Sequence, residues 1–161
     1  MSLQQIGKHG PSVFIEILPK LKGVRYFVFS GTALGLYRDG DLIPTDTDID
    51  FVIEKKYSSI ADLRTRLSNC DVQWESDDQV TFIHPKGVII DFLFFRECVD
   101  GWAFEAPHSW VIKKECFDSV DLRETKYGLI RFPVKVESIF AKKYGDDWRT
   151  PKFQKKATWA K

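Results

Sequence analysis

The chain has 161 residues, of which 43% are apolar and 29% charged, and its formal net charge is +1. This length supports a single domain over residues 1–161, and the composition excludes wholesale disorder. The near-zero net charge argues against binding to duplex nucleic acid. No apolar run approaches the roughly 20 residues that span a bilayer, and residues 1–10 lack the apolar region of a signal peptide, so we expect no transmembrane segment and a cytoplasmic protein. Cys70, Cys98 and Cys116 are widely spaced, which favours free thiols over a disulfide framework.

The hydrophobic pattern predicts alternating helices and strands along the chain. In the N-terminal half we expect a helix over 12–22 disturbed by Pro19, a strand over 24–29, a short helix over 31–37 with Ser30 as its N-cap, a strand over 48–53 and an amphipathic helix over 58–69. Strands are then expected over 72–75, 80–84, 88–95, 102–104 and 110–113, followed by a hairpin around 126–128 and a closing helix over 134–144 that ends at Gly145. This order predicts an α+β (α/β-like) fold, a mixed β-sheet flanked by helices, with a core over about 24–145 and a tail over 146–161.

Negative charge is concentrated in one segment. Residues 39–54, DGDLIPTDTDIDFVIE, contain six acidic residues and no Lys or Arg. The other residues carry 24 basic and 17 acidic side chains, so the body of the protein is mildly basic. A cluster of acidic residues in an otherwise mildly basic chain indicates a site that binds a cation together with an anionic ligand. It does not indicate a surface that binds duplex nucleic acid.

Two carboxylates within this segment have the spacing of a metal site. Asp48 and Asp50 are two residues apart on a predicted strand, so both side chains point to the same face, while Ile49 and Phe51 point into the core. Like charges this close raise each other's pKa unless a cation lies between them. Oxygen ligands on a rigid strand favour Mg²⁺ or Mn²⁺ over zinc. Asp46 is a further candidate ligand, or a cap for the strand.

A third carboxylate lies within an apolar strand. Asp91 interrupts the run VIIDFLFF, where a lone buried carboxylate would cost several kcal/mol. Such a residue is either paired with Arg or Lys or faces a functional site. On a central strand beside Asp48 and Asp50, it would complete a three-carboxylate metal centre.

A glycine-containing turn precedes these acids. Ser30, Gly31 and Thr32 follow a predicted strand and open a helix, where glycine lets a phosphate approach the backbone and the helix N-terminus offers free N–H groups. Arg38, at the end of that helix, either reaches a phosphate or forms a salt bridge with Asp39 or Asp41. Elsewhere, we expect His84 to be structural.

These motifs resemble a known pattern. Residues 29–31 with 48–51 are similar to the hG[ST]…DhDh arrangement of the nucleotidyltransferase fold, and SGTALGLYRDGDLIPTDTDIDF resembles the GTLLGxxRxxxxIPWDDDIDI stretch of the LicD/fukutin-related family. Residues 144–151, YGDDWRTP, resemble that family's closing YGxDWxxP. The chain departs from the pattern at Thr45 and Thr47, where the family has Trp and Asp.

The resemblance implies an activity and roles for the site residues. It implies transfer of a phospho-ligand, such as phosphocholine or a polyol phosphate, from a CDP-linked donor to a sugar or glycan hydroxyl. Asp48 and Asp50 would hold a metal on the pyrophosphate, and Asp91 would bind a second Mg²⁺ or Mn²⁺ ion or act as general base. The residues that would contact phosphate are Ser30, Gly31, Thr32 and Arg38, and either Lys142 or Lys143 could face the donor.

Two other functions remain open from the sequence. A nucleotidyltransferase that moves NMP from an NTP to a small molecule, protein or RNA would share the same acids, and so would a non-catalytic metal- or nucleotide-binding module. The products discriminate between the phospho-ligand transferase and the nucleotidyltransferase, because a CDP-linked donor releases CMP and an NTP releases pyrophosphate.

Overall fold

The computed structural model describes residues 6–98, 101–103 and 111–152. The helices are α1 (Gly10–Lys20), α2 (Ser30–Arg38), α3 (Ile60–Arg66) and α4 (Val136–Tyr144), with short 3₁₀ turns at Lys55–Tyr57 and Lys114–Cys116. The strands are β1 (Tyr26–Val28), β2 (Asp48–Glu54), β3 (Asp71–Ser76), β4 (Gln79–Ile83), β5 (Ile89–Cys98), β6 (Gly101–Ala103), β7 (Val111–Ile112), β8 (Val120–Thr125) and β9 (Gly128–Pro133). The predicted strand residues Phe104 and Trp110 and the tail beyond residue 152 lie outside the described ranges.

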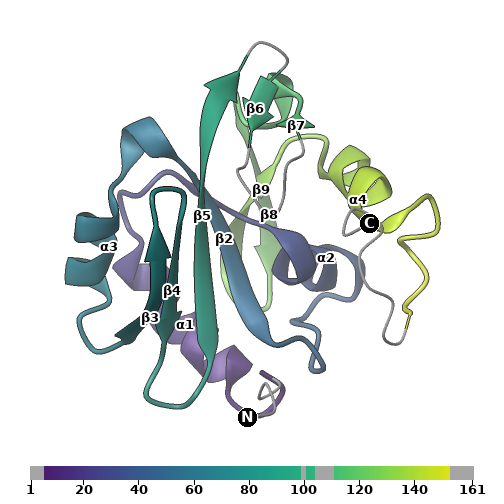
Figure 1. Ribbon diagram of the computed structural model, residues 1–161. Helices are drawn as coiled ribbons and strands as arrows, with labels where there is room; N and C mark the ends of the chain where they lie inside the picture. Colours follow the sequence, from purple (N-terminus) through teal and green to yellow (C-terminus); the bar gives the residue numbers. More distant parts are fainter. Residues whose placement is uncertain (1–5, 99–100, 104–110, 153–161) are drawn as a thin grey trace.

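The central sheet is mixed, as the sequence predicts. Its strand order is β1-β2-β5-β4-β3. β6 pairs with the C-terminal end of β5, and β7 pairs with β6. β2 runs parallel to β5, whereas β1, β4 and β3 pair with their neighbours in the antiparallel direction. In Figure 1, β4 and β3 lie on one side of the central β2–β5 pair, and α2 and α4 lie on the other. The α+β prediction with a mixed sheet and flanking helices is confirmed.

One face of the sheet packs against α1 and α3. Alternate residues of β2 and β5 point toward these helices, and their aromatic rings stack, with the centroids of Phe51 and Phe92 5.1 Å apart. Phe14 of α1 and Leu63 of α3 are fully buried in the same cluster. Each such side chain contributes about 1.5–3 kcal/mol by its burial. This packing fixes β2 and β5, and with them the direction of the side chains on the opposite face.

The opposite face of β2 and β5 is divided between a second core and the acids. Val52 and Phe95 pack there with Phe117 and Ile139. Asp48, Asp50 and Asp91 share this face but lie nearer the start of each strand. We call this face of the sheet the acid face. We call the cluster between the sheet and helices α1 and α3 the helix-side core; it includes Phe14, Phe51 and Phe92. Because this core holds β2 and β5 in place, the acids lie on a rigid surface.

Two local expectations need correction. Ser30 is not the N-cap of α2, since Phe29 occupies that position and Ser30 is the first helical residue. The helix expected over 58–69 is shorter, because the Ser59 hydroxyl accepts a hydrogen bond from Asp62 N–H (3.1 Å) and so starts α3 at Ile60. Of the described helices, not one combines the length and the apolar character needed to cross a membrane.

Candidate active site

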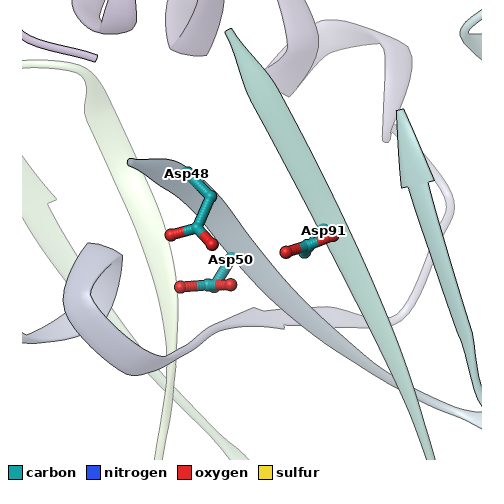
Figure 2. Close-up of side chains that lie close together, drawn as sticks. All are labelled: Asp48, Asp50 and Asp91. Atoms are coloured by element: carbon teal, nitrogen blue, oxygen red, sulfur yellow. The ribbon is translucent and has the colours of Figure 1, made fainter. Parts of the chain in front are cut away.

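Three aspartates from neighbouring strands converge on the acid face (Figure 2). Asp50 of β2 is directly paired with Asp91 of β5, and Asp48 lies two residues before Asp50 on the same face. One carboxylate oxygen from each residue lies within 4.8 Å of the other two. The expectation that Asp91 shares a face with Asp48 and Asp50 is therefore confirmed, while the catalytic roles of the three residues stay predictions.

Burial and mutual repulsion perturb these carboxyl groups. Burial, followed by the charges of Asp46 and Asp91, raises the pKa of Asp48 to about 7. Asp50 is only 8% exposed, and burial together with the charge of Asp48 raises its pKa well above the ordinary value. Three ionised carboxylates are therefore costly at this position without a compensating positive charge.

The chemistry of this donor set fits a divalent cation. Carboxylate oxygens on adjacent strands are hard ligands, which suit Mg²⁺ or Mn²⁺. A cation would offset the repulsion that raises the pKa values of Asp48 and Asp50. Asp46 lies outside the cluster of three, although its charge acts on both Asp48 and Asp50.

The glycine turn, Ser30 to Thr32, lies against Asp46, just before β2. Ser30 adopts a left-handed backbone conformation with φ of +51°, which is uncommon for a residue other than glycine. A Cβ atom added to Gly31 would lie 2.0 Å from Asp46 Oδ2, so only glycine fits at this position without displacing that carboxylate. Phe29, the N-cap, supplies no side-chain hydrogen bond to the first turn of α2. The backbone N–H groups of this turn are therefore suited to an anionic ligand.

Thr32 ties this turn to the acid strand. Its Oγ1 accepts a hydrogen bond from Asp50 N–H (2.9 Å), and Phe29 N–H donates to the carbonyl oxygen of Asp50 (3.1 Å). Thr32 is 1% exposed. A phosphate contact of Thr32 stays a prediction, and in the structure its side chain fixes the position of Asp50.

Comparison with known proteins places the chain in a family. The model of the LicD/FKTN/FKRP nucleotidyltransferase domain matches residues 23–136, well over half of the chain. The chain belongs to the LicD/FKTN/FKRP family. This membership confirms the resemblance seen in the sequence motifs, and it supports a transferase of the nucleotide or phospho-ligand type. A search of curated protein sequences finds no match for this LicD-family chain.

Solved structures share the fold of this LicD-family domain at low sequence identity. The lincosamide antibiotic adenylyltransferase LnuA, crystallised with lincomycin, has a TM-score of 0.55 and 13% identity, with 84% of this chain and 85% of that chain covered. ANT(2")-Ia in complex with adenylyl-2"-tobramycin has the same TM-score and identity, with coverage of 76% and 67%. These similarities confirm the nucleotidyltransferase fold.

Arg38 of the LicD-family domain forms a salt bridge, one of the two outcomes expected for it. Its Nε and one terminal nitrogen each donate to a carboxylate oxygen of Asp39 at 2.7 Å. The other terminal nitrogen donates to the backbone oxygen of Trp148 (3.3 Å). Trp148 is itself buried against Phe140, so Arg38 joins the end of α2 to the segment that follows α4.

Lys143 joins the site from α4, and the sequence did not distinguish it from Lys142. It is 6% exposed, and its Nζ donates a hydrogen bond to the Ser30 hydroxyl. Burial lowers the pKa of Lys143 to about 8, while the charges of Asp50, Asp48 and Asp46 act in the opposite direction. The spacing of the sequence could have distinguished Lys143 from Lys142. The buried residues of α4 are Val136, Ile139, Phe140 and Lys143, which have the spacing of one helix face.

His84 has the structural role expected from the sequence. It is 3% exposed, and its Nδ1 accepts a hydrogen bond from Lys86 N–H (3.1 Å). Its Nε2 therefore carries the proton in the neutral ring and donates to Glu16 (3.0 Å). His84 thus connects the end of β4 to α1 on the helix side of the sheet, away from the acids.

Proposed function

We propose that this LicD-family domain transfers a phospho-ligand, of the phosphocholine or polyol phosphate type, from a CDP-linked donor to a sugar or glycan hydroxyl in a reaction that requires a divalent metal. The observation that carries the proposal is the convergence of Asp48, Asp50 and Asp91 beside a glycine turn and a buried lysine. A site for a cation thus adjoins a site for phosphate, as a transfer of this type needs.

The donor phosphates bind where positive groups face the acids. The backbone N–H groups at Ser30 and Gly31 open α2, and the Lys143 ammonium group lies against the Ser30 hydroxyl. Both provide positive charge that would orient the pyrophosphate. A divalent ion on the three aspartates would neutralise charge on the pyrophosphate oxygens.

The acceptor reacts on the side of Asp91. The acceptor hydroxyl oxygen forms a new bond to phosphorus, the bond between that phosphorus and the leaving CMP oxygen breaks, and the hydroxyl proton passes to the Asp91 carboxylate oxygen that the ion would leave uncoordinated. Asp91 is held for this role, because its Oδ1 accepts a hydrogen bond from the Thr81 hydroxyl at 2.5 Å. Positioning and charge compensation supply most of the catalysis in such a reaction.

A second candidate is transfer of a nucleoside monophosphate from an NTP to a small molecule. The adenylyltransferase LnuA, which shares the fold, favours this alternative. The same acids and the same lysine would serve it, and pyrophosphate would leave in place of CMP.

Product analysis tests the proposal. Purified protein with Mg²⁺ is incubated with CDP-choline, CDP-ribitol or CDP-glycerol, or with each NTP, in the presence of a mixture of disaccharides, and nucleotides are separated by chromatography. We expect CMP from a CDP-linked donor, with no release by Asp50→Asn and unchanged release by the control Asp71→Asn, which alters an exposed acid. Pyrophosphate from an NTP would establish the second candidate. Equal rates for Asp50→Asn and the wild type would remove the catalytic assignment.

A further inference from the structure

A row of directly paired residues crosses the sheet from the acids to its edge. Asp50 of β2 pairs with Asp91 of β5, Asp91 pairs with Thr81 of β4, and Thr81 pairs with Trp74 of β3. Residues directly opposite each other on neighbouring strands project to the same face of a sheet. Trp74 therefore lies on the acid face, two strands away from Asp91.

A β-bulge places Trp74 on this face. Val72 pairs with Phe82, which is buried in the helix-side core, and the register then shifts so that Trp74 pairs with Thr81. In a regular ladder without the bulge, Gln73 would pair with Thr81 and Trp74 with Val80, which belongs to that same core. Bulges at sheet edges commonly redirect a side chain in this way.

Two polar side chains of β4, the strand between Trp74 and Asp91, contact Asp91. The Thr81 hydroxyl and the Gln79 amide (3.4 Å) both donate to Asp91 Oδ1, and both residues belong to β4. Trp74 itself is 49% exposed, one of the largest apolar surfaces that the sheet presents to solvent. An exposed indole on the same face as a hydroxyl and an amide of the next strand, and a carboxylate of the strand after it, matches a sugar chain, whose rings have an apolar C–H face and a rim of hydroxyls.

The arrangement of the site assigns this surface to the acceptor. α2 and α4, which carry Gly31 and Lys143, lie on one side of the β2–β5 pair, and β4 and β3 lie on the other (Figure 1). In an in-line displacement, the attacking and leaving groups occupy opposite sides of the phosphorus. If the donor phosphates bind on the α2 side, the attacking hydroxyl therefore approaches from the β3–β4 side.

We propose that Trp74, Gln79 and Thr81 form the acceptor subsite, in which a sugar ring stacks on the indole; the assignment of this sugar as acceptor rests on the proposed function. Two strand spacings, about 10 Å, separate the backbone at Asp91 from that at Trp74. This is the length of a disaccharide rather than of one hexose. The subsite therefore selects acceptors of at least two sugar units, with the reacting hydroxyl at Asp91 and the neighbouring ring on Trp74.

Saturation-transfer difference NMR tests the subsite without requiring turnover. Cellobiose, lactose and chitobiose are each titrated in the presence of Mg²⁺ against the wild type, Trp74→Ala and Trp74→Phe. Tyr57→Ala is the matched control, since Tyr57 is an exposed aromatic residue (47%) on a different segment. We expect saturation of sugar C–H protons by the wild type, about a tenfold rise in Kd for Trp74→Ala, a smaller rise for Trp74→Phe and no change for Tyr57→Ala.

A parallel donor experiment separates failure of this proposal from failure of the proposed function. Thermal shifts with CDP-choline and with each NTP are recorded for the same variants, and Trp74→Ala should retain any shift that the wild type shows. A donor shift lost in Trp74→Ala would assign the indole to the donor base and overturn the acceptor subsite. Absence of sugar binding by the wild type, or equal binding by Trp74→Ala, would also overturn it. Sugar binding that depends on Trp74, in a protein that consumes no donor, would uphold the sugar site and refute the transferase.

Discussion

Replacing Asp48 by Asn should stabilise the metal-free protein at pH 8. Burial and the charges of Asp46 and Asp91 raise the pKa of Asp48 from 3.8 to about 7. The folded protein binds this proton more tightly than the unfolded chain, so the resulting stability is complete below about pH 4 and is lost as the pH rises to about 7. A difference of about three pKa units corresponds to an effect of at most about 4 kcal/mol on the free energy of unfolding.

Thermal unfolding in EDTA measures this effect. For a chain of this size, 1 kcal/mol shifts Tm by about 2–4 °C, so we expect Asp48→Asn to melt at most about 8–16 °C above the wild type at pH 8 and close to it at pH 4. The control Asp71→Asn also removes one negative charge, but from an exposed position, and should leave Tm within about 2 °C of the wild type. Added Mg²⁺ should raise the Tm of the wild type more than that of Asp48→Asn. A variant no more stable than the wild type at pH 8 would refute the proposed charge repulsion.

Three further substitutions, with Lys142→Met as a control, test two glycines of α2 and the buried lysine. Gly31→Ala should displace the Asp46 carboxylate, whose oxygen would lie 2.0 Å from the new Cβ, and should reduce turnover at least tenfold with little change in Tm, as measured by parallel kinetics and melting curves. Gly35→Ala should instead lower stability by about 1–2 kcal/mol in urea titrations, because the new Cβ would meet a backbone carbonyl oxygen at 2.6 Å. Lys143→Met should abolish the thermal shift produced by the donor while Mn²⁺ still binds, whereas Lys142→Met, at an exposed position, should retain both. Identical donor shifts in the two lysine variants would argue against a phosphate contact for Lys143.

Much of the site follows from the period of a β-strand. Because alternate residues of a strand share a face, the D-x-D spacing places Asp48 and Asp50 together, and their apolar neighbours place that face opposite the helix-side core. Asp91 within an apolar run indicates a strand with a functional face. The sequence alone did not give the register that pairs Asp91 with Asp50, since register depends on how whole strands align.

Other features depend on contacts between distant segments. Ser30 adopts a left-handed conformation that is uncommon for residues other than glycine, so its side-chain propensity predicts an N-cap that the structure places at Phe29 instead. Lys143 occupies the buried face of α4 in a position that apolar residues usually take, so its role requires knowledge of the acids it faces. The direction of Trp74 depends on a single bulge, which reverses the alternation expected for a regular strand.

Direct measurement of metal binding tests whether the three aspartates form one cation site. Free Mn²⁺ is followed by electron paramagnetic resonance at pH 8 while the wild type, Asp50→Asn, Asp91→Asn and Asp71→Asn are titrated. We expect binding by the wild type and Asp71→Asn, and at least tenfold weaker binding by Asp50→Asn and by Asp91→Asn. Equal Mn²⁺ affinity in all four proteins would show that the three aspartates do not form a cation site.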